Sequence, residues 1–76
     1  MIGGFLRYSL KTGKKIAVVF LGKDGIVRKN VTVRALDEEA RRFTAALPGR
    51  KKEETFSFDD VLTCDYARGD RGDLEE

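Results

Sequence analysis

The stretch Thr55–Tyr66 constrains the fold of this chain more than any other. Apolar and polar residues alternate on both sides of Asp59-Asp60, which predicts a strand, a one-turn break and a second strand. A strand that is interrupted by a tight polar turn and then continues is typical of small barrels, in which the sheet has to turn corners. We therefore expect a small, mainly β domain whose last two strands are residues 52–58 and 61–66.

The preceding residues predict one helix and two more strands. Apolar residues recur at helical spacing over residues 2–12, and Gly13 follows where a left-handed C-cap belongs. Residues 15–21 are β-branched and apolar on both faces, so we expect a strand with one face on the core and the other covered by the N-terminal helix. An Asp-Gly pair then predicts a hairpin turn before a return strand over residues 26–36.

Residues 36–47 fit two local structures. A helix here would begin at Asp37 and stop before Pro48. In the alternative, apolar residues alternate along a strand over residues 43–47, and residues 48–51 form a hairpin loop. Helix propensity slightly favours the first structure, and the residue pattern alone leaves both open.

The organisation of the chain follows from its length and its apolar runs. The 76 residues leave room for one domain, which we assign to residues 1–66, and we expect residues 67–76 to be a disordered, charged C-terminal tail. No basic leader precedes the first apolar residues, and the longest apolar run is Ile16–Leu21, which argues against a signal peptide and a membrane span. The single cysteine, Cys64, allows no internal disulfide. A cytoplasmic protein that does not bind membranes is the expectation.

Three sequence patterns follow one another in an order that resembles the WYL domain family. A helical segment leads into an apolar strand, a basic residue with a later valine and leucine marks the second strand, and a Phe-x-x-Asp-x-hydrophobic pattern closes the stretch. The matching residues are Phe5–Leu10 and Lys14–Phe20, then Lys29, Val31 and Leu36, then Phe56–Val61.

The order of elements also resembles the Sm-like small barrel, which has an N-terminal helix, five strands and a one-turn break before the last strand. The resemblance implies a mainly β fold with one N-terminal α-helix, an Sm-like five-stranded small barrel. It also implies a strand over about Arg41–Leu47, after a turn at residues 37–39, and a function among ligand-sensing or nucleic-acid-associated regulatory modules, including transcription regulation. The Trp-Tyr-Leu signature itself is absent, and Arg42-Phe43-Thr44 stands in roughly its place.

Residue sets for catalysis and metal binding are largely missing from the sequence. The chain has no histidine, which excludes Ser-His, Cys-His and His-metal arrangements. Cys64 alternates with Leu62 and Tyr66, so we interpret it as a packed strand residue. Asp59-Asp60 is interpreted as a pair of turn-capping residues instead of an acid–base pair. We therefore expect a protein that is not an enzyme and that needs neither a metal nor a cofactor.

Basic residues are the candidate functional residues of this chain. Residues 1–52 hold 13 Lys/Arg against 4 Asp/Glu, whereas residues 53–76 hold 2 against 9. Cations on a strand face beside an aromatic ring suit a nucleic-acid backbone with bases stacked nearby. We predict a site for RNA, single-stranded DNA or a nucleotide-like ligand formed by Lys14, Lys29, Arg42, Phe43, Arg50, Lys51 and Lys52.

Two alternatives stay open at this point. The same cations fit a solvated surface that the acidic C-terminal third partly neutralises. Open edge strands of small barrels also invite pairing with another chain, so a protein-interaction or self-assembly module, such as a homo-oligomer joined through edge strands, is the second functional hypothesis. Clustering of the basic residues on one face would favour nucleic-acid binding, and scatter would weigh against it.

Overall fold

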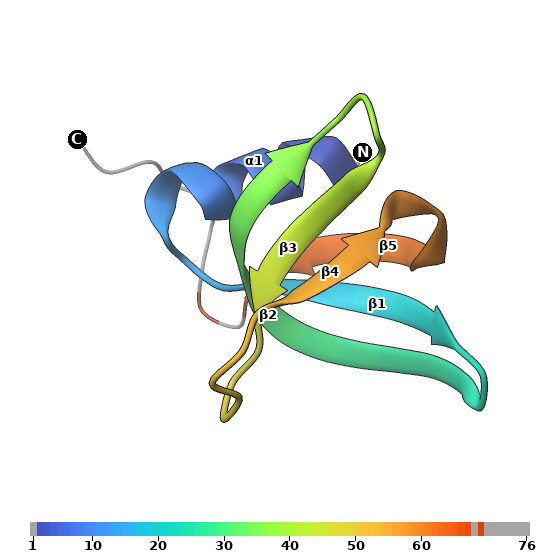
Figure 1. Ribbon diagram of the computed structural model, residues 1–76. Helices are drawn as coiled ribbons and strands as arrows, with labels where there is room; N and C mark the ends of the chain where they lie inside the picture. Colours follow the sequence, from blue (N-terminus) through green and yellow to red (C-terminus); the bar gives the residue numbers. More distant parts are fainter. Residues whose placement is uncertain (1, 68, 70–76) are drawn as a thin grey trace.

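The chain forms one N-terminal helix and five strands (Figure 1). The computed structural model describes residues 2–67 and residue 69, so most of the predicted tail lies outside the described residues. The mainly β arrangement with one N-terminal helix is confirmed, with small shifts at the ends of the elements. These are α1 (Ile2–Thr12), β1 (Ile16–Gly22), β2 (Gly25–Asp37), β3 (Arg42–Ala46), β4 (Glu54–Ser57), the 3-10 turn η1 (Phe58–Asp60) and β5 (Val61–Tyr66).

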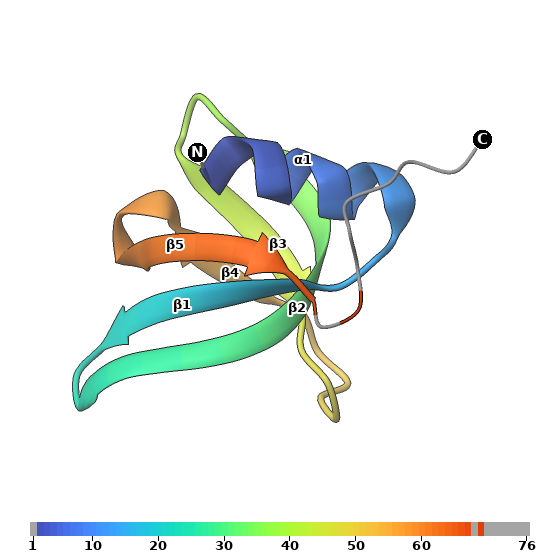
Figure 2. The ribbon, with the colours of Figure 1, turned by 180° about the vertical axis from the view of Figure 1, so that it is seen from behind.

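The five strands form one antiparallel sheet in the order β4-β3-β2-β1-β5. β2 is its long central strand: the first half, Gly25–Val31, pairs with β1, and the second half, from Thr32 to Asp37, pairs with β3. β4 and β5 are the two edges, and the sheet is not closed. Figure 2 shows the strong bend of the sheet, with β1 and β5 in front of β3 and β4.

The core lies on the inner side of this bend. Ile16 and Val18 on β1 are fully buried, and further along the strand the ring of Phe20 lies 4.6 Å from that of Phe56 on β4. The helix adds Leu6 and Tyr8 to the same cluster. An isolated helix of this length is marginally stable in water, so α1 gains most of its stability from this packing.

The helix therefore covers the same face of β1 that the core occupies. The expectation that it covers the other face is wrong: Ala17 and Val19 on that face line a small outer cavity with Arg28, Thr63 and Asp65, among others. Leu21 at the end of the strand is 56% exposed. The apolar second face of β1 is thus shielded by neighbouring strands near the middle of the sheet and open to solvent at the hairpin.

A buried hydroxyl fixes the helix to the sheet. Ser9 is fully buried, and its Oγ donates to the carbonyl oxygen of Lys14 at 2.6 Å and accepts from the amide of Val33 at 2.9 Å. Val33 adjoins the register shift between β2 and β3, where the regular ladder is interrupted. The hydroxyl therefore satisfies a buried backbone donor that would otherwise be left without a partner, and it holds the end of α1 against the bend in β2.

The ambiguous third segment is a strand, as the resemblance implied. Phe43, Ala45 and Leu47 are 1%, 0% and 6% exposed, whereas the intervening Thr44 and Ala46 are only half-buried. This alternation matches a strand with one face on the core, and the core decides the structure against the slight helix propensity. The preceding turn allows the chain to reverse from β2.

The predicted break in the closing stretch is the turn η1, but its cap differs from the prediction. The hydroxyl of Ser57 accepts a hydrogen bond from the amide of Asp59 at 3.2 Å, so serine is the N-cap of the turn. The carboxylate of Asp59 instead pairs with Arg41. The aspartates therefore do not cap the turn, because the preceding hydroxyl already occupies that position.

Candidate functional site

The seven residues that the sequence predicts for binding lie in separate parts of the structure. Arg50–Lys52 form the loop between β3 and β4, and Lys29 lies in the first half of β2. Arg42 and Phe43 begin β3 at the opposite end from that loop, and Lys14 follows the helix. The seven predicted residues therefore do not all belong to one site.

Lys29 and Arg50 are brought together by the fold. They line one cavity of about 300 Å³, whose other residues are Asn30, Leu47 and Pro48. Lys29 shares its face of β2 with the buried Val31 and lies opposite Val18 in the register. A lysine in this position packs its methylene chain along apolar surface and carries its ammonium out to the rim. Among the described residues no carboxylate forms an ion pair with it.

The loop beside this cavity adds exposed cations and some acidic neighbours. Its reversal is built on Gly49, with φ of 76°, and on a hydrogen bond from the amide of Arg50 to the carbonyl oxygen of Leu47 at 3.2 Å. A shallow hollow is lined by residues 50–54, three basic and two acidic. Arg50 lies 3.8 Å from Glu54, a long contact between exposed groups. We call Lys29, Arg50, Lys51 and Lys52 together the basic loop surface.

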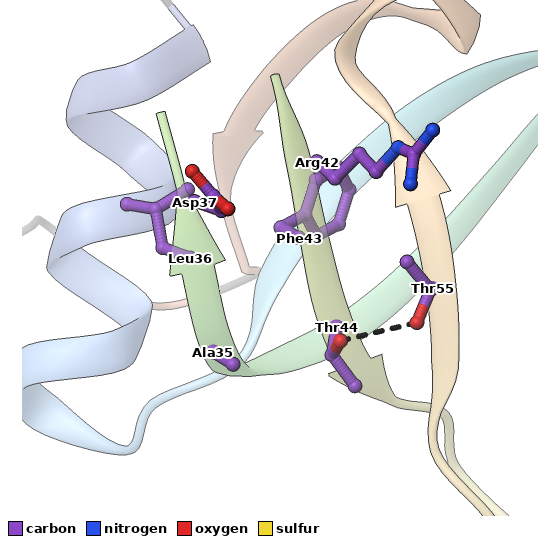
Figure 3. Close-up of a pocket in the computed structure, with 7 residues that line it drawn as sticks. All are labelled: Ala35, Leu36, Asp37, Arg42, Phe43, Thr44 and Thr55. Atoms are coloured by element: carbon purple, nitrogen blue, oxygen red, sulfur yellow. Dashed lines mark hydrogen bonds between the residues drawn. The ribbon is translucent and has the colours of Figure 1, made fainter. Parts of the chain in front are cut away.

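Arg42 does not belong to the basic loop surface. It is exposed at the start of β3 and has Asp37 as its partner in the register. It lines a cavity of about 210 Å³ between β2, β3 and β4, where Thr44 and Thr55 share a hydrogen bond of 3.2 Å across the strands (Figure 3). An acidic residue at its side lowers the attraction of this cavity for an anion.

Phe43 is a core residue that lines the same cavity as Arg42 but exposes almost none of its ring. It is 1% exposed, and its ring centroid lies 5.4 Å from that of Phe56 and 6.1 Å from that of Phe58. Stacking of a base needs an exposed ring, so the predicted role of Phe43 conflicts with its position. Lys14 is held by its backbone, through the carbonyl that accepts from Ser9, and it lines neither of the cavities around Arg42 and Lys29.

A corner that the sequence did not reveal is centred on Arg41. Its backbone has a positive φ of 57°, and its carbonyl oxygen accepts from the amide of Phe58 at 2.9 Å. The guanidinium lies 5.6 Å above the ring of Phe58 and 3.1 Å from the carboxylate of Asp59. Arg7 on the helix pairs with Glu38 in the same region. No local pattern signals these contacts, because they join turns that are far apart in the sequence.

Cys64 is buried in β5, as the sequence indicated. It is 8% exposed, and burial raises the pKa of its thiol from the ordinary 9.0 to about 11. A thiol with so high a pKa is a weak nucleophile at neutral pH. Within the described part of the chain, His, Cys, Asp and Glu residues form no group of three or more that fits a metal ion.

No family model, curated protein or solved structure matches this chain. In the part of the chain that the structure describes, no helix combines the length and apolar character needed to cross a membrane.

Proposed function

We propose that this protein is a small, non-catalytic binding module that holds the backbone of RNA or single-stranded DNA at the basic loop surface. The observation that carries the proposal is the convergence of Lys29 and Arg50 on one cavity, although they are 21 positions apart in the sequence. Lys51 and Lys52 extend this positive surface along the loop, and both are exposed.

The chemistry of this surface suits phosphate groups. Each phosphate that is neutralised by Lys or Arg releases counterions, which supplies most of the affinity of sequence-independent binding. Lys29 has no acidic partner among the described residues, so its ammonium does not have to break an ion pair to meet a phosphate. A cavity of about 300 Å³ is at the lower end of the size of small-ligand pockets, so a nucleotide-like ligand would occupy the same position.

The finer fold assignment supports this class of function. We propose that this strongly bent sheet, whose edges β4 and β5 do not pair, is an open form of the Sm-like small barrel, of a WYL-like type. The N-terminal helix, the central bent strand β2 and the one-turn break η1 before β5 support that assignment. Small five-stranded barrels of other kinds also bind oligonucleotides on their strands and loops.

Binding can be tested with a labelled oligouridylate and a labelled oligothymidylate by fluorescence anisotropy at several salt concentrations. We expect binding that weakens steeply with salt, with a slope of about 0.7 per contacted phosphate. The double substitution Lys51→Glu and Lys52→Glu should weaken binding at least about tenfold, because charge reversal replaces attraction by repulsion. Lys23→Glu at the hairpin tip is the matched control and should have little effect. Binding that is absent at low salt would remove the proposal.

A second candidate function, self-assembly, is favoured by the two free edges of the sheet. Among the described residues β4 and β5 each pair on one side only, and both lie at the limits of an unclosed sheet. Exposed edges provide unpaired backbone groups for another chain. Light scattering that gives the mass of a dimer or larger ring at high concentration would support this function, and a monomer would contradict it. Phe43 cannot contribute apolar surface to such a contact, because it is buried.

A further inference from the structure

The first half of β2 has one unpaired edge. β3 pairs with β2 only from Thr32 onward, and within the described residues Gly25–Val31 pairs with β1 alone. To the turns and loops that the structure describes, this segment makes no backbone hydrogen bond. In Figures 1 and 2 the hairpin of β1 and β2 extends away from the rest of the sheet. A further strand could therefore pair with β2 here without displacing any element.

The end of β3 explains why this edge is free. Ala46 is the last residue of β3 and lies opposite Thr32, and the chain then turns away through Pro48. Proline lacks an amide hydrogen and cannot continue a ladder. The cavity that contains Lys29 and Arg50 lies at this point, where β3 leaves β2. The position that a longer β3 would occupy is thus left open.

Two apolar side chains on this segment are exposed. Ile26 is 68% and Val27 is 41% exposed, one on each face of the strand. Native sheets usually protect such edges with charges, bulges or covering loops. An edge that keeps adjacent apolar residues in solvent has surface to bury when another strand pairs with it.

The next two residues are both basic and decide which partner fits. Arg28 and Lys29 follow Val27 directly, again one on each face, and neither forms an ion pair with a described residue. Two copies of this segment that paired in parallel register would bring these cations opposite one another, and like charges at opposed positions are destabilising. An acidic strand would meet them with opposite charge.

We propose that the edge Gly25–Val31 of β2 accepts an extended acidic peptide as an additional antiparallel strand, in the position where β3 has ended. Antiparallel pairing that continues the direction of β3 places the partner's residues opposite Lys29, Arg28, Val27 and Ile26 in that order. The matching peptide therefore carries the sequence Glu-Glu-Val-Val, with the acidic pair first. Backbone hydrogen bonds supply affinity, and the side chains supply register and specificity.

The test uses three designs of capped, fluorescein-labelled peptide, all of equal length, on the full chain. The first contains Glu-Glu-Val-Val at its centre, the second contains the reversed order Val-Val-Glu-Glu, and the third is the first peptide with its backbone amides methylated on alternate residues, prepared in both alternations. We expect the first peptide to bind at least about tenfold more tightly than the reversed one, a difference of ~1.4 kcal/mol. One of the two methylated versions should lose binding, because only one alternation directs its amides toward β2.

Amide hydrogen exchange and a charge swap complete the test. The first peptide should protect amides within residues 25–31, and Arg28→Glu should weaken it while tightening a Lys-Lys-Val-Val peptide. Arg28 is exposed, so this variant should keep its fold, which circular dichroism checks. Equal binding of all versions, with no protection of β2, would show simple charge attraction and overturn the proposal. An oligonucleotide that protects residues 25–31 when the peptide does not would assign the edge to nucleic acid instead.

Discussion

The two ends of β3 differ in how their charged residues are used. At the corner where β3 begins, Arg41 contacts Asp59 and the ring of Phe58. At the loop where β3 ends, Lys51 and Lys52 have no ion pair with described residues, and the contacts of neighbouring arginines with carboxylates are 3.8 Å long. Both ends are rich in charge and expose their side chains, but Arg41 at the corner contacts a carboxylate at 3.1 Å, whereas the cations of the loop have longer contacts with carboxylates or none among the described residues.

This difference shows why charge density alone does not identify a binding surface. A guanidinium that already contacts a carboxylate and a ring has to lose those contacts before it binds an anion elsewhere. A lysine in solvent loses only water and conformational freedom. The corner is therefore expected to contribute to stability and the loop to binding, and substitutions in each region can separate the two roles.

The largest expected effect on the free energy of unfolding is in the core beneath the corner around Arg41. Phe43→Ala removes a fully buried ring that contacts Phe56 and Phe58, so it should lower the free energy of unfolding by about 3–5 kcal/mol. Urea denaturation followed by circular dichroism measures this loss. Arg42→Ala, the adjacent exposed position, is the control and should stay within about 0.5 kcal/mol of the parent.

If the Phe43→Ala variant does not fold at all, the size of the effect cannot be measured with it. Phe43→Leu keeps most of the apolar volume and should give a smaller loss, of about 1–2 kcal/mol. If both substitutions left stability unchanged, Phe43 would have to be an exposed residue, and its predicted role in stacking would return.

The next effect in size concerns pH and the thiol of Cys64. Burial raises the pKa of this thiol from 9.0 to about 11, so the folded chain keeps its proton at a pH where the unfolded chain loses it. Stability from this group is therefore complete below pH 9 and is lost as the pH rises through about 11, by ~2–3 kcal/mol in total. Comparison with Cys64→Ala isolates the contribution of this thiol.

Urea midpoints of the parent and of Cys64→Ala, measured from neutral to strongly alkaline pH, give the result. The parent should lose stability more steeply above pH 9 than the variant does. Parallel curves would mean that the thiol is accessible to solvent. Neither outcome concerns the loop, whose lysines lie outside the core.

What could be predicted from the sequence depends on whether a feature is local or joins distant parts of the chain. Strand positions were predictable where burial imposes a period of two, as on residues 43–47. The relation between distant cations was not predictable. The register shift between Val33 and Ala35 interrupts the alternation of β2, so that Ala35 is exposed although simple alternation from Val33 would bury it.

The candidate site was predicted in part for a similar reason. Lys29 and Arg50 share a cavity because β3 ends where it does, a long-range fact that no local pattern contains. Phe43 is an aromatic residue next to basic residues in the sequence, but neighbours in a strand point to opposite faces. Its basic neighbour Arg42 is exposed for the same reason that Phe43 is buried.

A smaller effect is expected at Arg41 itself. Arg41→Ala removes an exposed ion pair and the contact with the ring of Phe58, which together are worth about 1 kcal/mol. It also leaves a residue with a side chain at φ of 57°. Arg41→Gly should therefore be more stable than Arg41→Ala by about 1 kcal/mol, because glycine adopts a positive φ without steric cost. Thermal or urea denaturation of both variants decides this, and equal stabilities would show that the turn changes its backbone conformation when the guanidinium is removed.

The smallest effect on stability, and the most informative for function, is expected at Lys51. Lys51→Ala removes an exposed cation with no ion pair among the described residues, so the free energy of unfolding should change by less than about 0.5 kcal/mol. If the loop binds phosphates, the same variant should reduce the salt slope of oligonucleotide binding by about 0.7, the contribution of one contact. Lys23→Ala, a lysine in the exposed turn of the β1–β2 hairpin, should leave the slope unchanged. A loss of stability at Lys51 without a change in slope would place this lysine with the residues of the corner, as a structural one, and would remove the difference between the two ends of β3.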